Sequence, residues 1–159
     1  METYFSIDKI STYYRSVLTI GSFDGLHQGH QEIVNRTVHM AKGKKVPSIV
    51  VTFDPHPRHI LNYEETKLPI IMSLENKLVM LENLGVDGTL IIPFTSEFSQ
   101  LSASDFLESI IEEIFHPEDL VIGYDHHFGH DRSGSPEFVR EYMKNSDINL
   151  VIVDAVSDE

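Results

Sequence analysis

Ten residues decide the fold class of this chain, GSFDGLHQGH at positions 21–30. They overlap the end of VLTIGS, residues 17–22, an apolar run that ends in a glycine-bearing turn and predicts a short buried strand. They lead into residues 28–43, where apolar side chains recur at helical spacing and Gly43 is the expected C-cap. A strand, a glycine-bearing turn and a helix in this order form the first half of a βαβ unit.

The rest of the chain continues the alternation of strands and helices. Further strands are expected at residues 46–53, 86–94, 119–123 and 148–153. Helices are expected at residues 73–84, 102–114 and 135–145, each headed by a serine that can cap it. Because strands that alternate with helices are joined by right-handed crossovers, we expect an α/β, Rossmann-like, three-layer fold with a mostly parallel five-stranded sheet.

Composition limits the class of partner. The chain has 159 residues, with 12 Lys and Arg against 25 Asp and Glu, and a net charge of −13. A field of that sign repels nucleic-acid phosphates, so we expect no nucleic-acid partner. No apolar run approaches the roughly 18 residues of a membrane span, so we expect no membrane association. The lack of cysteine is compatible with the cytoplasmic location that we expect, and the oligomeric state stays open.

The loops after the strands are where the sequence predicts chemistry, because ligands of such sheets bind outside the carboxyl ends of the strands. The loops concerned are residues 23–28, 54–59 and 124–135, which are rich in His, Asp, Gly or Pro. His27 and His30 lie at the start of the first helix, near the positive end of its dipole. Imidazole N–H groups can bind phosphoryl oxygens there, and Gly29 lets a ligand approach the backbone. The pattern suits a triphosphate.

Two other interpretations of the histidine pair stay open. A His-x-x-His pair on a helix is also compatible with half of a zinc site, although no third ligand is evident and we expect no metal held by the protein. It is equally compatible with two surface histidines. The place behind a glycine-bearing turn, at a strand–helix junction, favours a functional role.

These segments resemble a known family. The pattern H-x-G-H after a first strand resembles the nucleotidylyltransferase superfamily. The fuller form GSFDGLHQGH is similar to the FAD synthetase module of the bifunctional prokaryotic riboflavin kinase/FAD synthetase family. TFDPHP at residues 52–57 and GYDHHFG at residues 123–129 are similar to that family's loops after the second and fourth strands. The resemblance covers nearly the whole chain, including FSQLSASDF at residues 98–106.

The resemblance implies an enzyme that transfers the adenylyl group of ATP to FMN, giving FAD and pyrophosphate. It implies Mg²⁺ bound mostly by ATP oxygens and water, with ATP and FMN as partners. It makes His27 and His30 the catalytic residues, which would hold and stabilise the phosphates. The residues expected on the nucleotide side are Gly21, Ser22, Phe23, Asp24 and Gly29. Those expected on the flavin side are Phe53, Pro55, His56, Pro57, Asp125 and Phe128.

The two flavin-side loops also have a plainer interpretation. Phe53 and the prolines after it make a stiff loop with a flat face, which suits an isoalloxazine ring but also a rigid connection with a core phenylalanine. His126 stands where relatives have an aromatic residue, and His127 where they commonly have Arg, so His127 would be a weaker and pH-dependent cation. The histidines of this loop are also compatible with a solvated polar loop.

Two parts of the family's pattern are missing from the chain. It stops before the family's I-S-S-T-x-I-R segment, whose Arg can stabilise transition-state charge, and it lacks the riboflavin kinase barrel. We therefore expect one transferase domain over residues 1–159, truncated at its C-terminal end, weakly active or inactive, and without kinase activity. A non-catalytic ATP- or flavin-binding fragment, and a nucleotidylyltransferase with another phosphorylated acceptor, remain as alternative functions.

Overall fold

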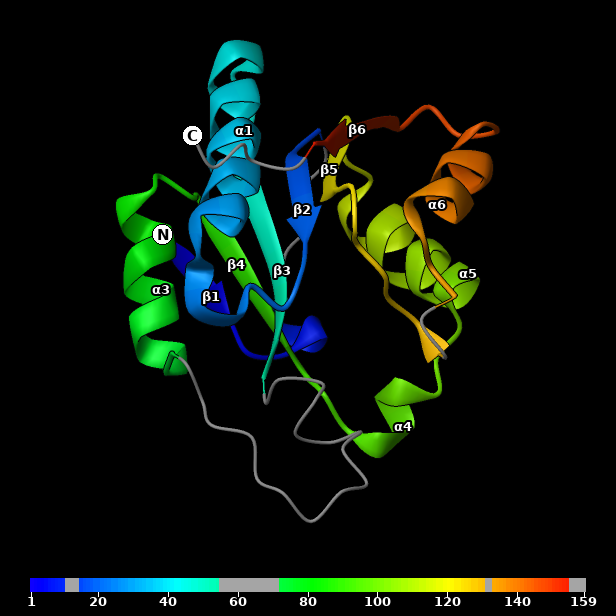
Figure 1. Ribbon diagram of the computed structural model, residues 1–159, viewed down its shortest axis with the longest axis horizontal. Coiled ribbons are helices and arrows are strands. Elements are labelled where there is room, and N and C mark those ends of the chain that lie inside the picture. The colour runs from blue at the N-terminus through cyan, green and yellow to red at the C-terminus, as the bar shows by residue number, and fades with distance from the viewer. Residues whose placement is uncertain (11–14, 55–71, 131–132, 155–159) are drawn as a thin grey trace.

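Parallel strands form one sheet with helices on both of its faces (Figure 1). The computed structural model describes residues 1–10, 15–54, 72–130 and 133–154. The strands are β1 (Glu2–Tyr4), β2 (Val17–Ile20), β3 (Ser48–Asp54), β4 (Gly88–Pro93), β5 (Asp119–Gly123) and β6 (Asn149–Val153). Their order in the sheet is β1-β4-β3-β2-β5-β6, and each neighbouring pair is parallel. The α/β, Rossmann-like fold predicted from the sequence is confirmed.

The helices of the described residues vary in length and type. The longer ones are α1 (Gln28–Lys44), α3 (Leu74–Asn83), α6 (Pro136–Met143) and a π-helical segment, η3 (Leu107–Phe115). The shorter ones are η1 (Ile7–Lys9), η2 (Asp24–Leu26), α4 (Ser96–Ser99) and α5 (Ala103–Phe106). Ser73, Ser102 and Ser135 cap α3, α5 and α6 as predicted, each accepting a hydrogen bond from a backbone N–H in the first turn.

Successive side chains of the central strands point to opposite faces of the sheet and pack into different apolar clusters. The sheet and the helices on its two faces therefore form three layers. On one face Val50 of β3 packs with Val34 of α1 and Leu81 of α3. On the other face Val51 shares a cluster with Ile111 of η3. Figure 1 shows α1 and α3 on one side of the sheet and α5 and α6 on the other. Burial on both faces explains why the strands are continuous apolar runs.

Three sequence predictions about the fold need correction. The sheet has six strands rather than five, because the three residues Glu2–Tyr4 pair with β4 at the edge without forming an apolar run. Gly43 lies inside α1, and the C-cap is Lys45, in the left-handed region with φ 59°. The helix expected over residues 102–114 is two segments, because helical hydrogen bonding changes to the π type at Leu107.

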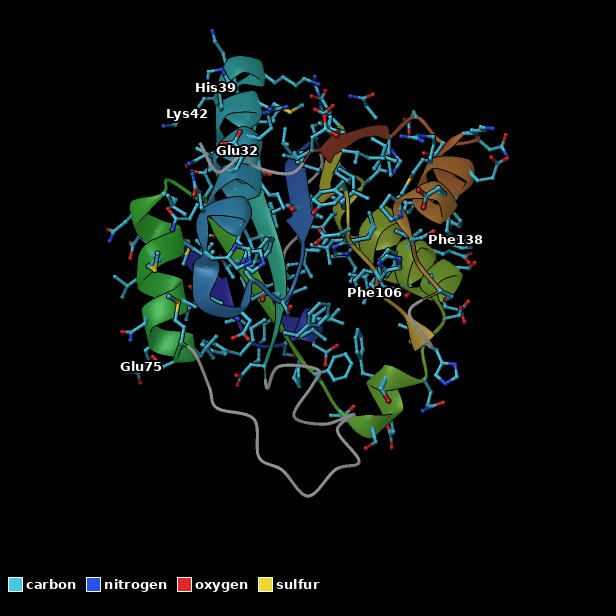
Figure 2. The ribbon with its side chains drawn as sticks, viewed as in Figure 1. Glu32, His39, Lys42, Glu75, Phe106 and Phe138 are labelled. Carbon is cyan, nitrogen blue, oxygen red and sulfur yellow. The ribbon has the colours of Figure 1, made fainter. Side chains whose placement is uncertain are left out.

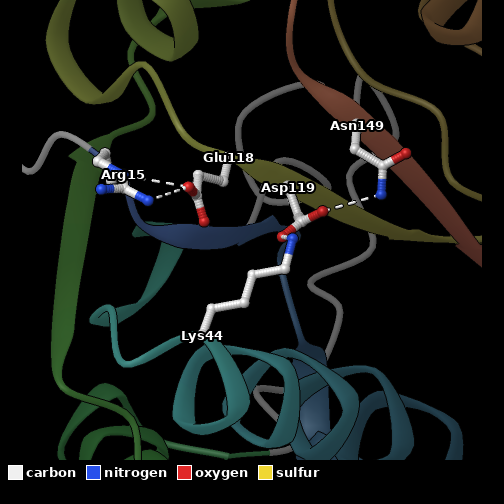
Figure 3. A network of polar contacts seen from close by, with 5 residues as sticks. All are labelled: Arg15, Lys44, Glu118, Asp119 and Asn149. Atoms are coloured by element: carbon white, nitrogen blue, oxygen red, sulfur yellow. Dashed lines mark hydrogen bonds and ion pairs between the residues drawn. The ribbon is translucent and has the colours of Figure 1, made fainter.

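A polar network ties the amino ends of the strands to the C-terminal turn of α1 (Figure 3). The carboxylate of Asp119 is fully buried and accepts hydrogen bonds from Lys44 Nζ at 2.5 Å and Asn149 Nδ2 at 2.8 Å. Beside it, Arg15 pairs with Glu118 at 2.8 Å across a more exposed surface. The network therefore joins α1, β5 and β6 at the edge of the sheet opposite to the carboxyl ends.

The strand order reverses between β2 and β5. From β2 the chain continues outward through β3 and β4, and later returns to β5 on the other side of β2. In open parallel sheets this switch point creates a crevice at the carboxyl ends of the two strands. Of the helices in the described part of the chain, none is both long and apolar enough to span a bilayer.

Candidate active site

The loop with the two histidines and the segment around Asp125 meet at the carboxyl ends of β2 and β5. These two strands are direct neighbours in the sheet, with Thr19 opposite Val121. The carboxylate of Asp125 is close enough to raise the pKa of His30, although other groups outweigh it. The structure thus brings together two of the predicted segments at the switch point.

The turn between β2 and α1 has an unusual backbone. Phe23 and Leu26 adopt left-handed conformations with φ of 48° and 43°, and Gly25 lies between them with φ 77°. A non-glycine residue in that region costs about 1–3 kcal/mol and is typical of functional sites. Gly21 makes room for this turn, because a Cβ at that position would lie 2.9 Å from the ring of Phe23.

The imidazole rings of His27 and His30 are stacked at the start of α1. Their centroids are 3.6 Å apart, and the planes are inclined by 27°. The rings of Phe23 and His30 meet edge to face, with centroids 5.6 Å apart and an interplanar angle of 87°. Gly29 leaves space beside His27, because a Cβ there would lie 3.3 Å from the His27 ring. Phe23 and His27 therefore hold His30 from two sides.

His30 is uncharged at neutral pH. Burial lowers its pKa to about 4, and the neighbouring His27 contributes in the same direction. Asp125 and Asp24 act in the opposite direction, and Lys77 adds a small lowering effect. The Nδ1 atom of His30 is buried and has no hydrogen-bond partner among the described residues. A buried polar atom in that state is one that a bound ligand can satisfy.

The backbone carbonyl of Ser22 is anchored from the opposite side of the loop. It accepts hydrogen bonds from Lys77 Nζ at 2.7 Å and from Thr52 Oγ1 at 3.2 Å. Burial lowers the pKa of Lys77, while Asp24 and Asp54 raise it. Sequence reasoning missed Lys77. The available signal was its spacing of four residues from Leu81, which puts a lysine on the buried face of α3.

The flavin-side phenylalanines belong to an aromatic cluster. Phe53 and Phe128 are both buried, and each contacts Phe106, at centroid distances of 6.4 Å and 5.4 Å. Phe94 and Phe98, which sequence reasoning missed, contact Phe53 at 5.7 Å and 5.8 Å and are only partly buried. Phe106 lies on the helical layer opposite α1 (Figure 2). Pro55, His56 and Pro57 lie outside the described residues.

The segment after β5 is held by glycines. Phe128 and Gly134 exchange backbone hydrogen bonds of 3.2 Å and 2.8 Å, and a Cβ on Gly134 would lie 2.7 Å from the Phe128 ring. Gly129, with φ 79°, packs against the backbone of Ala103. His127 Nδ1 lies 3.0 Å from the carbonyl oxygen of Asp125. Asp125 is exposed, whereas Phe128 is buried, so the two predicted residues face different surroundings.

Two further features concern metal binding and the surface of α1. The described residues contain no group of three or more His, Cys, Asp or Glu side chains that could hold a metal ion. A surface hollow along α1 is lined by Glu32, Asn35, Arg36, Val38, His39, Lys42 and Leu84. Figure 2 shows Glu32, His39 and Lys42 on α1. Of the predicted site residues that the structure describes, none lines this hollow.

Comparison with known proteins supports one family. The family model for FAD synthetase matches residues 9–159. The bifunctional riboflavin kinase/FMN adenylyltransferase of Listeria monocytogenes is 32% identical over 151 residues, which are 93% of this chain and 48% of the relative. The protein of the same name from Pseudomonas fluorescens is 37% identical over 124 residues, which are 78% and 39% of the two chains. The chain therefore spans less than half the length of these relatives.

Solved structures share the fold. A Streptococcus pneumoniae structure described as a macrolide-efflux protein superposes with a TM-score of 0.81 at 28% identity, covering 99% of this chain and 52% of that one. Pantothenate synthetase from Thermus thermophilus superposes with a TM-score of 0.55 at 18% identity, covering 99% and 63%. The second likeness concerns the fold alone.

Proposed function

The chain belongs to the FAD synthetase family, and we propose that it transfers the adenylyl group of ATP to the phosphate of FMN. An oxygen of the FMN phosphate attacks the α-phosphorus of ATP in line. The bond from that phosphorus to the oxygen bridging it to the β-phosphate breaks, so that pyrophosphate leaves and FAD remains. The proposal covers this reaction only and does not extend to the riboflavin kinase activity in the relatives' names.

One observation carries the proposal, namely the stacked pair His27 and His30 at the switch point between β2 and β5. A neutral His30 can donate one N–H to a phosphate oxygen. Because the ring is uncharged, its burial does not remove a hydrated imidazolium ion from water. Groups held in advance around developing charge stabilise the transition state more than mobile groups do. In this proposal both histidines bind the ATP phosphates, and His30 also faces the leaving pyrophosphate.

The remaining residues are assigned to two sides of the cleft. Gly21, Ser22, Phe23, Asp24 and Gly29 are proposed to shape the nucleotide side. Phe53, Pro55, His56, Pro57, Asp125 and Phe128 are proposed for the flavin side. Phe53 and Phe128 are themselves buried in the core, and the partly buried Phe94 and Phe98 beside Phe53 offer the apolar, flat surface to which a flavin ring binds best.

The proposed partners are ATP with Mg²⁺ and FMN, in the cytoplasm, with neither nucleic acid nor membrane. Mg²⁺ would be held mostly by ATP oxygens and water, and would neutralise phosphate charge. The net charge of −13 supports the exclusion of nucleic acid.

The test is direct. The chain is incubated with ATP, Mg²⁺ and FMN, and the flavins are separated by chromatography. We expect slow formation of FAD by the parent chain, in line with the weak activity expected from the sequence, and a further loss of about 100-fold or more in rate for His30→Ala. His39→Ala is the matched control, because His39 is an exposed histidine on the same helix. Equal rates for the parent and His30→Ala would exclude the catalytic assignment, and binding of FMN without FAD would favour a non-catalytic module.

A further inference from the structure

Lys77 is the buried cation closest to the histidine loop. Its side chain lies on α3, on the same helical face as Leu81, and only 7% of the residue is exposed. Lysine is rarely buried to this extent without a partner, because burial disfavours its charged form. Burial does lower the pKa of Lys77, so the fold bears a cost to keep an ammonium group in this place.

The partner of that ammonium group is the backbone of the loop. Lys77 Nζ donates to the carbonyl oxygen of Ser22 at 2.7 Å, and Thr52 Oγ1 donates to the same oxygen at 3.2 Å. A carbonyl oxygen has two lone pairs, so these two donors occupy its hydrogen-bonding capacity. The peptide plane between Ser22 and Phe23 is thereby fixed from α3 on one side and β3 on the other.

That peptide plane leads directly into Phe23, the residue that packs against His30. The next residue, Phe23, has an unfavourable left-handed conformation. Such a conformation persists only where neighbouring contacts hold it, and the two hydrogen bonds to the preceding carbonyl are contacts of that kind. The Phe23 ring then contacts the His30 ring edge to face at 5.6 Å. A continuous set of contacts therefore leads from Lys77 through Ser22 and Phe23 to His30.

Two carboxylates, one on each of two neighbouring segments, act on Lys77. Asp24, in the histidine loop, and Asp54, the last residue of β3, both raise the pKa of Lys77. Their attraction partly offsets the desolvation of the ammonium group. Lys77 therefore lies between the histidine loop and the carboxyl end of β3.

We propose that Lys77 is a positioning residue, which fixes the Ser22 carbonyl and thereby holds Phe23 and His30 in the geometry needed for adenylyl transfer. This inference rests on the proposed function for its kinetic consequence, but its structural part can be tested alone. Lys77 acts through the loop and does not touch the reacting atoms.

The kinetic test compares four variants of the full chain. Lys77→Met removes the donor at similar volume, and we expect kcat to fall about 100-fold, as a shift of about 1 Å at a reacting group does. The KM for ATP should rise as well, because the loop that Lys77 holds carries the residues assigned to the nucleotide, whereas the KM for FMN should stay within about threefold. Thr52→Val removes the second donor and should lower kcat about fivefold, the equivalent of one neutral hydrogen bond. Lys77→Arg keeps the charge and the hydrogen-bond donors and should recover part of the lost kcat. Lys42→Met, which changes an exposed lysine on α1, should leave kcat unchanged.

The second readout does not depend on activity. In chains with ¹⁵N-labelled histidine, the ring resonances of His27 and His30 report their stacking, and those of His39 and His116 serve as internal references. Lys77→Met and Thr52→Val should both shift the His27 and His30 signals, and Lys42→Met should not. Unchanged His30 signals in a folded Lys77→Met chain would overturn the inference, as would an unchanged kcat.

Failure of the two proposals would look different. If the parent chain forms no FAD, the proposed function fails, and the histidine signals alone decide whether Lys77 positions His30. If Lys77→Met does not fold, Thr52→Val decides, because it loosens the same carbonyl oxygen while retaining the lysine. A folded Thr52→Val chain with parental kcat and parental His30 signals would overturn the inference.

Discussion

His27 and His30 stack face to face with their ring centroids 3.6 Å apart, and the inner ring, His30, has a pKa lowered to about 4. Two imidazolium ions at that distance would repel each other strongly, so protonation of one opposes protonation of the other. In the free protein the two rings are therefore stacked in place without both carrying a positive charge, and their N–H groups can bind an anion.

The lowered pKa of His30 predicts an acid-sensitive stability. In the unfolded chain His30 has its ordinary pKa of 6.5, so between pH 6.5 and pH 4 the unfolded state binds more protons than the folded state. The free energy of unfolding should therefore fall as the pH drops through this window. The groups facing His30 are His27, Asp125, Asp24 and Lys77. In His30→Asn, the urea midpoint should decline less between pH 7 and pH 4.5 than in the parent chain.

The control for this prediction is His39→Asn, which changes an exposed histidine of the same helix. Its urea midpoints should run parallel to those of the parent chain across the same pH range. A His30→Asn chain that also ran parallel to the parent would contradict the assignment of a depressed pKa to His30.

Two glycines should respond to alanine in opposite directions. Gly21→Ala puts a Cβ 2.9 Å from the Phe23 ring, so the buried ring must move, at a cost of about 1–3 kcal/mol in the free energy of unfolding. Gly43→Ala meets nothing within 4 Å inside α1 and should stabilise by about 0.5–1 kcal/mol. Chemical denaturation measures both. A stable Gly21→Ala chain would show that the packing of Phe23 does not depend on Gly21.

The fully buried carboxylate of Asp119 should contribute more to the free energy of unfolding than the partly buried carboxylate of Glu118 beside it. Asp119→Ala leaves Lys44 and Asn149 without their acceptor, and we expect a loss of about 2 kcal/mol in the free energy of unfolding. Glu118→Ala breaks the pair with Arg15, whose side chain is 74% exposed, and should cost at most about 1 kcal/mol. Equal losses in urea titrations would mean that burial does not strengthen the Asp119 contacts.

The aromatic cluster predicts a selective effect on the flavin. Phe98 is partly buried and contacts Phe53 at 5.8 Å. In Phe98→Leu the KM for FMN should rise about threefold to tenfold, the value of one aromatic contact, while the KM for ATP stays unchanged. Phe138→Leu is the control, since Phe138 is a partly buried aromatic residue on α6 (Figure 2). A parallel rise in both constants for Phe98→Leu would point to a general loss of structure.

The local sequence pattern predicted the central strands and the helices that cover them, but not the strand at the edge of the sheet. The strands at Val17–Ile20 and Ser48–Asp54 are recognisable because burial on both faces requires unbroken apolar runs. The edge strand Glu2–Tyr4 has no such requirement, since its three residues are exposed or only half-buried, so its pairing with β4 is visible only in the folded chain. The type of hydrogen bonding in η3 likewise has no simple sequence signal.

The candidate site divides in the same way. His27 and His30 could be proposed as site residues from their spacing and from the strand before them, because both signals are local. Lys77 could not, because its role depends on a carbonyl group fifty-five positions away in the chain. Phe94 and Phe98 read as ordinary apolar residues in sequence, and only the packing of β3 against the helical layer shows that they extend the surface around Phe53.

The position of β2 in the sheet has a consequence for how the chain is made. β2 (Val17–Ile20) is fully buried and pairs with β3 on one side and with β5 on the other. During synthesis, β2 and β3 leave the ribosome long before Asp119–Gly123 has been translated. Until then an apolar strand presents an open edge, to which another nascent chain can pair. We therefore expect early ribosome-bound intermediates of this protein to expose this strand edge, and the junction of the His27–His30 loop with β5 to form only late in translation.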